Sequence, residues 1–268
     1  METFKLGMCQ IKVSNSKERN IDNAVWHLKQ CRNNGVNIAV LPEMFNCPYD
    51  INKFGEFAES ITTGETVKCM AETAKQLDMF IVAGSIPEIE NSKIYNTCLV
   101  FDRLGKIIGK HRKIHLFDIN IPGKMVFNES SILTAGDSVT VVDTDYAKLG
   151  IGICFDMRFP ELYSKMCRMG AECIITPGAF NMFTGPAHWE LLVRTRALDN
   201  LLYHAAVSPA RNNSSSYIAY GNSMIVSPWG TILTKAEEQE QIIYADIDLT
   251  EIKKCRSKIP IINRVLIE

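Results

Sequence analysis

Apolar residues along this chain fall into two kinds of pattern. Short, nearly continuous runs that contain many β-branched residues occupy positions 36–41 and 148–153, and such runs are typical of strands covered on both faces. Apolar residues spaced three and four positions apart instead predict helices within residues 21–31, 67–77 and 187–200. Because the two patterns alternate, we expect a mixed α/β protein.

Further apolar runs predict strands between and after these helices. Residues 94–101 and 106–113 flank a turn at 102–105 and predict a β-hairpin. Helices that alternate with both single strands and hairpins argue against a purely parallel barrel and predict helices packed on the outside of sheets. The single strands are predicted at residues 79–84, 203–207, 221–227, 231–235 and 242–247.

Length and composition favour one large domain. A chain of 268 residues with 46% apolar content can bury about three-quarters of the surface that its unfolded form exposes. No linker or internal repeat divides it, so we expect a single α/β domain over residues 1–268. The net charge of −1, from 29 basic and 30 acidic residues, creates no overall field that would attract nucleic acid or an anionic membrane.

The cysteines and the N-terminal residues indicate a reducing compartment. Nine cysteines, an odd number without a C-x-x-C pair, indicate neither a disulfide framework nor a zinc site. The first residues lack a basic segment followed by an apolar one, and no apolar run approaches membrane-spanning length. We therefore expect a cytoplasmic protein.

One cysteine occupies a position suited to a nucleophile. Cys154 follows the apolar run 148–153 and precedes a charged turn, and Pro160 fits the first turn of the helix that should follow. A sharp turn from strand to helix lifts a side chain clear of a sheet and directs backbone N–H groups toward whatever that side chain attacks. A buried structural cysteine is the alternative interpretation, since free cysteine is among the most buried residue types.

Two charged residues also stand at the ends of strand-like runs, and their surroundings resemble a known family. The segments LPEMF around Glu43, RKIHLF around Lys113 and GICFDMRFP around Cys154 are similar to the three signature blocks of the nitrilase superfamily of carbon–nitrogen hydrolases. The resemblance covers nearly the whole chain. It implies a nitrilase-like α-β-β-α sandwich that usually pairs into a homodimer.

The resemblance also implies a role for each residue of a Glu-Lys-Cys triad. Cys154 is the nucleophile that forms a thioester, and Glu43 takes the thiol proton, gives it to the departing ammonia and then activates water. Lys113, together with the backbone N–H of Phe155, stabilises the tetrahedral oxyanion. Glu129 matches a second acidic residue that the family places beside the lysine, and a solvent-facing loop carboxylate is the alternative interpretation.

Histidine offers a rival chemistry, because a Cys–His pair would act as in papain-like proteases. Nothing in the sequence brings a histidine to Cys154, and His188 is interpreted as a structural hydrogen-bonding residue. No phosphate-binding glycine loop or metal-ligand spacing is present, so we expect a hydrolase without a cofactor. The histidines available in principle are His111, His115, His188 and His204.

Additional segments resemble the omega-amidase branch of the superfamily. That branch removes ammonia from the terminal amide of short dicarboxylic acid monoamides such as 2-oxoglutaramate and succinamate. The chain departs from the family after residues 259–260, where the family's longer tail, ending in an Arg-x-Asp-Leu-Tyr-like segment, has no counterpart. The matching segments are YNT at 95–97, PGK at 122–124, PGAFN at 177–181, TGPAHWE at 184–190, SPAR at 208–211 and PWG at 228–230.

Arg158 is the candidate for recognition of the substrate's distant carboxylate. It lies four residues beyond Cys154, and its planar guanidinium matches a carboxylate. An ion pair with Asp156 or Glu161 is the alternative, and the family resemblance favours the substrate role. The motif match implies four further pocket residues, which are Tyr49, Phe155, Phe180 and Thr184.

Two alternative functions remain open at the level of sequence. A sister amidase of the same superfamily would accept a larger acyl chain, such as deaminated glutathione, or an N-carbamoyl compound. A catalytically silent binding protein would keep the fold without the activity, although the intact triad argues against it. In every enzymatic case the partner is a small-molecule amide.

Overall fold

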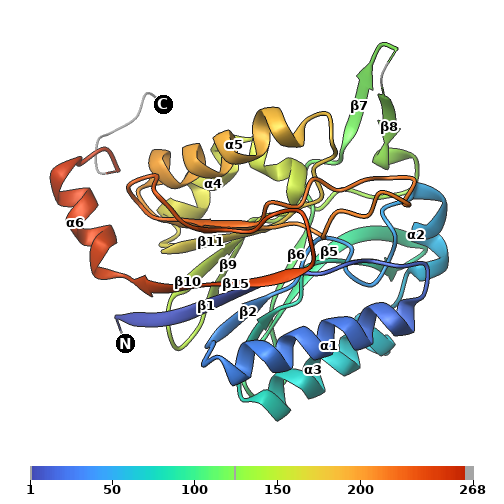
Figure 1. The fold of residues 1–268 in the computed structure, drawn as a ribbon, viewed down its shortest axis with the longest axis horizontal. Helices are drawn as coiled ribbons and strands as arrows, with labels where there is room; N and C mark the ends of the chain where they lie inside the picture. The colour runs from blue at the N-terminus through green and yellow to red at the C-terminus, as the bar shows by residue number, and fades with distance from the viewer. Residues whose placement is uncertain (1, 124, 263–268) are drawn as a thin grey trace.

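Two β-sheets lie face to face in the middle of the molecule (Figure 1). In the computed structural model, which describes residues 2–123 and 125–262, the two sheets differ in their strand order. The first sheet contains, in spatial order, β15 (Gln241–Asp248), β1 (Thr3–Gln10), β2 (Ile38–Val40), β3 (Phe80–Val82), β5 (Lys93–Phe101) and β4 (Ile86–Glu90), with β6 (Ile107–Arg112) also paired to β5. The second contains β14 (Ile232–Lys235), β13 (Met224–Val226), β12 (Tyr203–Val207), β11 (Cys173–Pro177), β10 (Lys148–Ile151) and β9 (Thr140–Asp143).

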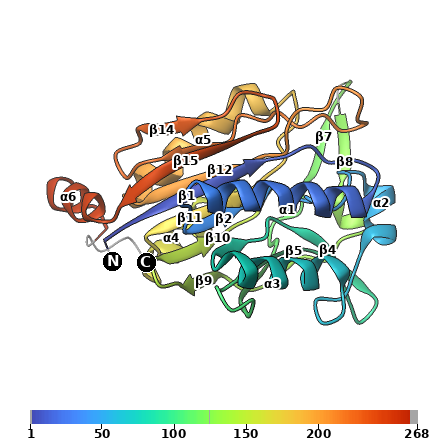
Figure 2. The same ribbon diagram turned by 60° about the horizontal axis from the view of Figure 1, so that its bottom comes forward.

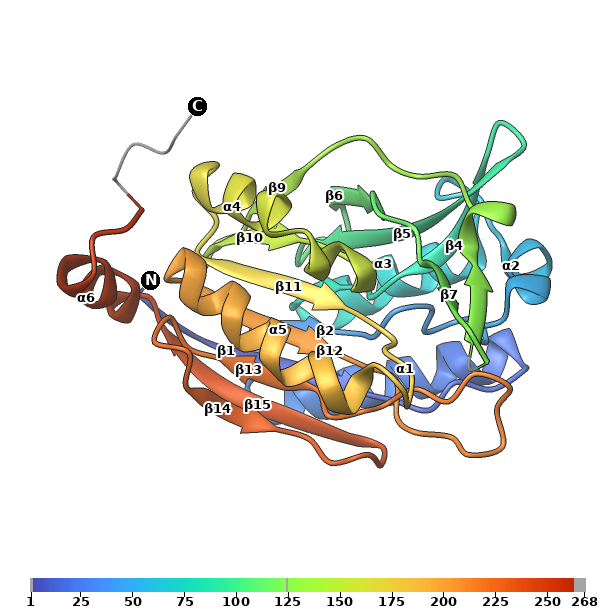
Figure 3. The ribbon, with the colours of Figure 1, turned by 90° about the horizontal axis from the view of Figure 1, so that it is seen from above.

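Helices cover the outer face of each sheet (Figure 2). On the first sheet lie α1 (Lys17–Asn33) and α3 (Glu65–Leu77), and on the second lie α4 (Pro160–Arg168) and α5 (Gly185–Asn200), which Figure 3 shows from above. The resulting layers are helix, sheet, sheet and helix, as the resemblance implied. The remaining elements are α2 (Ile51–Phe57), α6 (Thr250–Lys258), the 3₁₀ turns η1 (Glu129–Ser131) and η2 (Cys154–Arg158), and a separate ribbon of β7 (Asp118–Ile121) and β8 (Met125–Asn128).

The inner strands are buried on both faces, as their continuous apolar runs predicted. In β1, Leu6 and Met8 point into the core between the sheets, whereas Cys9 points to the core under α1 and α3. Ile38 of β2 faces the inner core, and its neighbour Ala39 faces the helices. This alternation follows from the two-residue period of a strand.

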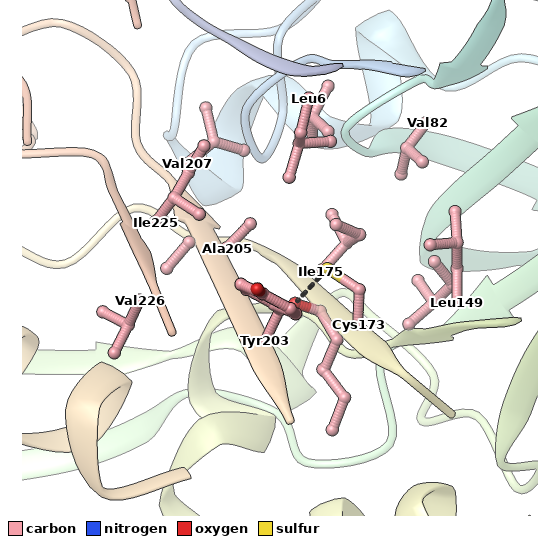
Figure 4. Close-up of a cluster of buried hydrophobic side chains, with 14 of the residues drawn as sticks. Leu6, Val82, Leu149, Cys173, Ile175, Tyr203, Ala205, Val207, Ile225 and Val226 are labelled. Carbon is pink, nitrogen blue, oxygen red and sulfur yellow. Dashed lines mark hydrogen bonds between the residues drawn. The ribbon is translucent and has the colours of Figure 1, made fainter. Parts of the chain in front are cut away.

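Side chains from both sheets meet in the inner core (Figure 4). Leu6 and Val82 come from the first sheet, and Leu149, Ile175 and Val207 come from the second. Full burial of such a side chain stabilises the fold by about 1.5–3 kcal/mol. These contacts hold the two sheets together and so set the spacing of the loops that join them.

Most predicted elements are present, with some shifts at their ends. The predicted strand 148–153 ends at Ile151, because the chain turns into η2 at Cys154. Pro160 begins α4, as predicted, and the hairpin predicted at 94–113 is formed by β5 and β6. The sequence analysis did not predict β1, β4, β7, β8, β9, β11, α2 or α6, several of which are short elements with few apolar residues.

Two features of the sequence analysis lie outside the described residues. Lys124 of the PGK segment is one, and the tail from residue 263 onward is the other. None of the described helices is both long enough and apolar enough to cross a membrane.

Candidate active site

The three predicted triad residues come from the ends of strands in different sheets. Glu43 follows β2 and Lys113 follows β6, and both strands belong to the first sheet. Cys154 begins η2 directly after β10 of the second sheet. All three side chains are buried where the loops of the two sheets meet.

The backbone at Cys154 is held in a conformation that non-glycine residues rarely adopt. Its φ is 47°, in the left-handed region, which costs on the order of 1–3 kcal/mol unless the surroundings impose it. The backbone N–H of Ile153 donates to Asp156 Oδ2 at 3.0 Å, which closes the turn around the cysteine. Gly178 packs against the other side, where a Cβ would lie 3.2 Å from the Cα of Cys154. The turn is therefore fixed from both sides.

Lys113 lies between two carboxylates inside the protein. Its Nζ is 3.0 Å from Glu43 Oε1 and 2.9 Å from Glu129 Oε2, and all three side chains are fully buried. Burial by itself would lower the pKa of Lys113, but the charges of Glu129 and Glu43 raise that pKa above its usual value. The ammonium is therefore a permanent positive charge in a site without bulk water.

The Glu43 carboxylate has a hydrogen-bond donor on each oxygen. Oε1 accepts from Lys113 and from Asn96 Nδ2 at 2.9 Å, and Oε2 accepts from the backbone N–H of Ala179 at 2.7 Å. Burial raises the pKa of Glu43, Lys113 opposes this rise, and the nearby Glu129 adds to it. A carboxylate with a raised pKa is a better proton acceptor, which suits a general base.

Burial and the neighbouring Glu43 control the ionisation of the Cys154 thiol. Burial raises the pKa of Cys154 well above its usual value, and the negative charge of Glu43 raises it further. The side chain is therefore a thiol at rest, because neither effect favours a thiolate. A nucleophilic Cys154 would need a neighbouring base to accept its proton.

Glu129 is buried rather than solvent-facing, so its alternative interpretation as a loop carboxylate is wrong. Its Oε1 accepts from the Tyr49 hydroxyl at 2.5 Å, and its Oε2 accepts from the backbone N–H of Phe117 at 2.6 Å. Tyr49 also lies 3.3 Å from Lys113 Nζ. The structure thus places Tyr49 beside the charged residues and not among the residues that line the pocket at Cys154.

The pocket at Cys154 contains the other predicted substrate residues. Four of them come together there, two from η2 and two from the segment between β11 and α5, and the sequence analysis missed three more. Two of the three, Phe117 and Ala179, lie in the RKIHLF and PGAFN segments that carried the resemblance, whereas Tyr217 lies in a loop without such a motif. The pocket is lined by the predicted Cys154, Phe155, Arg158, Phe180 and Thr184 and by the additional Phe117, Ala179 and Tyr217.

Among the described residues, Arg158 is not paired with a carboxylate. Its guanidinium carbon lies 5.0 Å from the ring centre of Phe180 and 5.5 Å from that of Phe155, and it donates to His188 Nδ1 at 3.3 Å. Burial lowers the pKa of Arg158, but a guanidinium stays charged at any ordinary pH. Asp156 is engaged elsewhere, and the alternative ion pair of Arg158 with Asp156 or Glu161 is not among the contacts of the described residues.

Asp156 binds two histidines instead. Its Oδ2 lies 3.1 Å from His111 Nε2, and its Oδ1 lies 2.8 Å from His115 Nδ1. Burial alone would raise the pKa of Asp156, but the hydrogen bonds from His111 and His115 hold that pKa below its usual range. His204 bonds to Thr176, so no described histidine pairs with Cys154, and the papain-like alternative is not supported. Sequence reasoning missed Asp156, whose only signal was its place in the charged turn.

Comparison with known proteins assigns the chain to a family. A family model described as carbon-nitrogen hydrolase matches residues 5–257. The chain belongs to this family. Among curated carbon–nitrogen hydrolases, omega-amidase NIT2 of Mus musculus is 48% identical over 98% of this chain and 95% of its own length, and nitrilase homolog 2 of Dictyostelium discoideum is 51% identical over 98% of this chain and 80% of its own length.

A solved carbon–nitrogen hydrolase has the same fold. Nit3 of Saccharomyces cerevisiae, a member of branch 10 of the nitrilase superfamily, superposes with a TM-score of 0.90 at 40% identity and covers 97% of this chain and 95% of its own. These comparisons confirm the predicted superfamily and the predicted class, a hydrolase of carbon–nitrogen bonds other than peptide bonds. Within residues 2–123 and 125–262, no group of three or more His, Cys, Asp or Glu side chains is arranged to hold a metal ion.

Proposed function

We propose that this carbon–nitrogen hydrolase is an omega-amidase that hydrolyses the terminal amide of short dicarboxylic acid monoamides, such as 2-oxoglutaramate and succinamate, to the dicarboxylate and ammonia. Relatives named omega-amidase are 46–48% identical to this chain over 98% of its length, and they support the omega-amidase activity. The observation that carries the substrate class is the guanidinium of Arg158, which lines the same pocket as Cys154. No carboxylate among the described residues forms an ion pair with it.

Acylation follows from the placement of the charges. As the sulfur of Cys154 attacks the amide carbon, its proton passes to Glu43, and a tetrahedral oxyanion forms. Lys113 has three N–H donors, two of which bind carboxylates, and the third makes a longer contact of 3.3 Å with Tyr49. That third donor and the backbone N–H of Phe155 stabilise the oxyanion. The proton on Glu43 then moves to the nitrogen, the C–N bond breaks, and ammonia and a thioester remain.

In deacylation Glu43 again first accepts a proton and then donates it. Glu43 takes a proton from water, the resulting hydroxide adds to the thioester carbon, and the C–S bond breaks. The proton returns from Glu43 to the sulfur of Cys154, which restores the resting thiol. Glu129 takes no proton in this scheme and holds Lys113 in place through the contact of 2.9 Å.

Three further properties belong to the same proposal. We place the protein in the cytoplasm, expect residues 1–268 to form one carbon–nitrogen hydrolase domain, and expect two copies to form a homodimer. Its partner in the reaction is a small amide, and no cofactor takes part in the scheme above.

The nucleophile is tested by replacing Cys154. We expect Cys154→Ala to abolish ammonia release from succinamate while leaving the fold intact, since the change removes a single sulfur atom from a turn. Mass spectrometry of the wild-type enzyme, quenched during turnover, should find an acyl adduct on the peptide that contains Cys154. Ammonia release at the wild-type rate by Cys154→Ala would contradict the assignment.

The substrate class is tested through Arg158. Loss of a buried carboxylate contact costs about 2–5 kcal/mol, so Arg158→Met should lower kcat/KM for succinamate by roughly thirtyfold or more. Butanamide lacks the carboxylate, so its slow hydrolysis should change little. Arg158→Lys should restore only part of the loss, because an ammonium cannot form the two-pronged contact.

An equal loss on both amides would show that Arg158 supports the pocket rather than the carboxylate. A panel that adds deaminated glutathione and an N-carbamoyl compound separates the sister amidases, since both share the triad. Inactivity of the wild-type enzyme on the whole panel would favour a silent binding protein.

A further inference from the structure

One buried carboxylate joins the segment that carries Lys113 to the turn that carries Cys154. The side chain of Asp156, two residues after Cys154, is fully buried. Its partners His111 and His115 lie two residues before and two residues after Lys113. Residues two apart in an extended chain share a face, which places His111 of β6 on the same side as Lys113. Both histidines therefore reach the turn at Cys154 from the segment that positions Lys113.

Each oxygen of the Asp156 carboxylate has two hydrogen-bond donors. Oδ1 accepts from the backbone N–H of His115 at 2.9 Å and lies 2.8 Å from Nδ1 of the same residue. Oδ2 accepts from the backbone N–H of Ile153 at 3.0 Å and lies 3.1 Å from His111 Nε2. An ionised carboxylate can only accept, so both imidazole nitrogens donate. The carboxylate therefore ties the backbone of the nucleophile's turn to the backbone of the segment that carries the ammonium.

Aromatic rings hold the same two segments together at a second point. The ring of His115 stacks on that of Phe159 with their centres 3.5 Å apart, and the ring centres of Phe117 and Phe155 are 5.3 Å apart. Apolar contacts have no strict direction, whereas hydrogen bonds restrict both the distance and the angle between their partners. The rings therefore press the segments together, and the carboxylate determines where they come to rest.

We propose that Asp156 is a positioning residue, which holds the sulfur of Cys154 and the ammonium of Lys113 at the separation at which both act on one amide carbonyl group. The inference rests on the roles proposed above for Cys154 and Lys113. In acylation the sulfur adds to the carbonyl carbon while Lys113 stabilises the charge that develops on the carbonyl oxygen. A displacement of about 1 Å can lower such a rate by about a hundredfold. Asp156 itself takes no proton and does not contact the substrate.

Asp156→Asn tests the proposal with a side chain of the same shape. An asparagine has one oxygen and one NH₂ group, so in either orientation the NH₂ group meets two N–H donors. Because the misplacement acts on the reaction step, we expect kcat for succinamate to fall by about a hundredfold and KM to change much less. Tyr163→Phe is the control, since it removes a buried hydroxyl that bonds to Thr176 of β11 and not to the Lys113 segment. It should lower the urea midpoint of unfolding and leave kcat close to the wild-type value.

Variants of His111 give a second readout, which a general loss of stability would not produce. His111→Leu removes one of the four donors to Asp156, whereas His111→Gln keeps a donor because its amide N–H can take the place of Nε2. We expect kcat to fall about tenfold in His111→Leu and to recover in His111→Gln. The double variant of Asp156→Asn with His111→Leu should have a kcat no lower than that of Asp156→Asn alone, because both changes remove the same contact. His111→Leu also serves if Asp156→Asn does not fold, as judged by circular dichroism.

Three results would overturn the proposal. A folded Asp156→Asn enzyme with nearly normal kcat would show that the carboxylate does not position the reacting groups. Equal losses of kcat in Asp156→Asn and Tyr163→Phe would show that any weakening around the turn has the same effect. Equal losses in His111→Leu and His111→Gln would show that the hydrogen bond to Asp156 is not what His111 contributes. Inactivity of the wild-type enzyme on succinamate would be a different outcome, because it would contradict the proposed function itself.

Discussion

At the scale of single residues, the central feature is one ammonium shared by two buried carboxylates. Lys113 contacts both Glu43 and Glu129, and none of the three side chains is exposed to solvent. Burial of charges is tolerated only when they are paired, and removing one partner of such a pair costs about 3–5 kcal/mol of unfolding free energy. The same three charges therefore determine both the chemistry and the stability of the site.

Two substitutions distinguish the contribution of these charges to catalysis from their contribution to stability. Glu43→Gln keeps the shape of the side chain but cannot accept a proton, and Lys113→Met leaves two carboxylates without their cation. Both should lower kcat by at least about a hundredfold. Lys113→Met should also lower the unfolding free energy by roughly 3–5 kcal/mol, and Glu43→Gln should lower it less, because Lys113 keeps its contact with Glu129. Steady-state kinetics and urea unfolding measure the two effects, and a folded Glu43→Gln enzyme with nearly normal kcat would leave Cys154 without a base.

At the scale of elements, a buried hydrogen-bond chain joins α4, β11, β12 and α5. The Tyr163 hydroxyl of α4 and Thr176 Oγ1 of β11 lie 2.7 Å apart, and Thr176 lies 2.9 Å from His204 Nε2 of β12. His204 Nδ1 donates to the Val193 carbonyl of α5 at 3.0 Å, so Nε2 is the acceptor nitrogen of a neutral ring. The chain connects the second sheet to its helices, and its Tyr163 hydroxyl lies close to Gly152, where a Cβ would be 3.0 Å away, two residues before Cys154.

This chain predicts a loss of stability in mild acid. Burial lowers the pKa of His204 to about 4, the Val193 carbonyl opposes this effect, and the positive charge of Arg196 adds to it. The unfolded chain binds a proton on this histidine below about pH 6.5, whereas the folded protein does so only near pH 4. The stabilisation is therefore complete above about pH 6.5 and is lost as the pH falls toward 4, by roughly 3 kcal/mol.

Urea unfolding at a series of pH values tests the assignment. We expect the unfolding free energy of His204→Gln to depend less on pH than that of the wild type between about pH 6.5 and pH 4. Both proteins should be compared at pH 8 as well, where the histidine is neutral in either state. Parallel profiles across the acid range would mean that another group causes the loss.

At the scale of the whole molecule, the outer side of α5 carries an exposed apolar patch. The side chains of Leu191, Leu198 and Trp229 are 66%, 46% and 52% exposed and line one hollow of about 570 Å³. Large exposed apolar side chains that cluster mark sites of association. A second copy of the chain is the occupant that the family resemblance implies.

The expected homodimer can be tested with a matched pair of variants. Sedimentation velocity should find a dimer for the wild type, and Leu191→Glu should shift the mass toward the monomer because it buries a charge in the contact. Leu104→Glu is the control, since Leu104 is 78% exposed in the turn between β5 and β6 and does not line the hollow. A wild-type monomer, or a dimer that Leu191→Glu leaves intact, would contradict this use of the patch.

The sequence by itself determined much of the local structure and singled out the candidate reactive groups. Apolar spacing predicted the buried strands and the main helices, because strand and helix periods are properties of short segments. The turn at Cys154 and the motifs around Glu43 and Lys113 carried the resemblance, which the family match confirmed. The end of an apolar run is also a local feature of the sequence. The run that ends at residue 153 therefore predicted the end of β10, at Ile151, to within two residues.

Only the tertiary structure decided which of these groups meet. The carboxylate of Glu129 lies on Lys113, and Tyr217 lines the pocket at Cys154, because packing of the two sheets brings distant loops together. The surroundings of Arg158 were decided in the same way, since Asp156 is bound by histidines from another segment and the guanidinium lines the pocket at Cys154. Such contacts depend on distances across the fold, and a pattern within one segment carries no information about them.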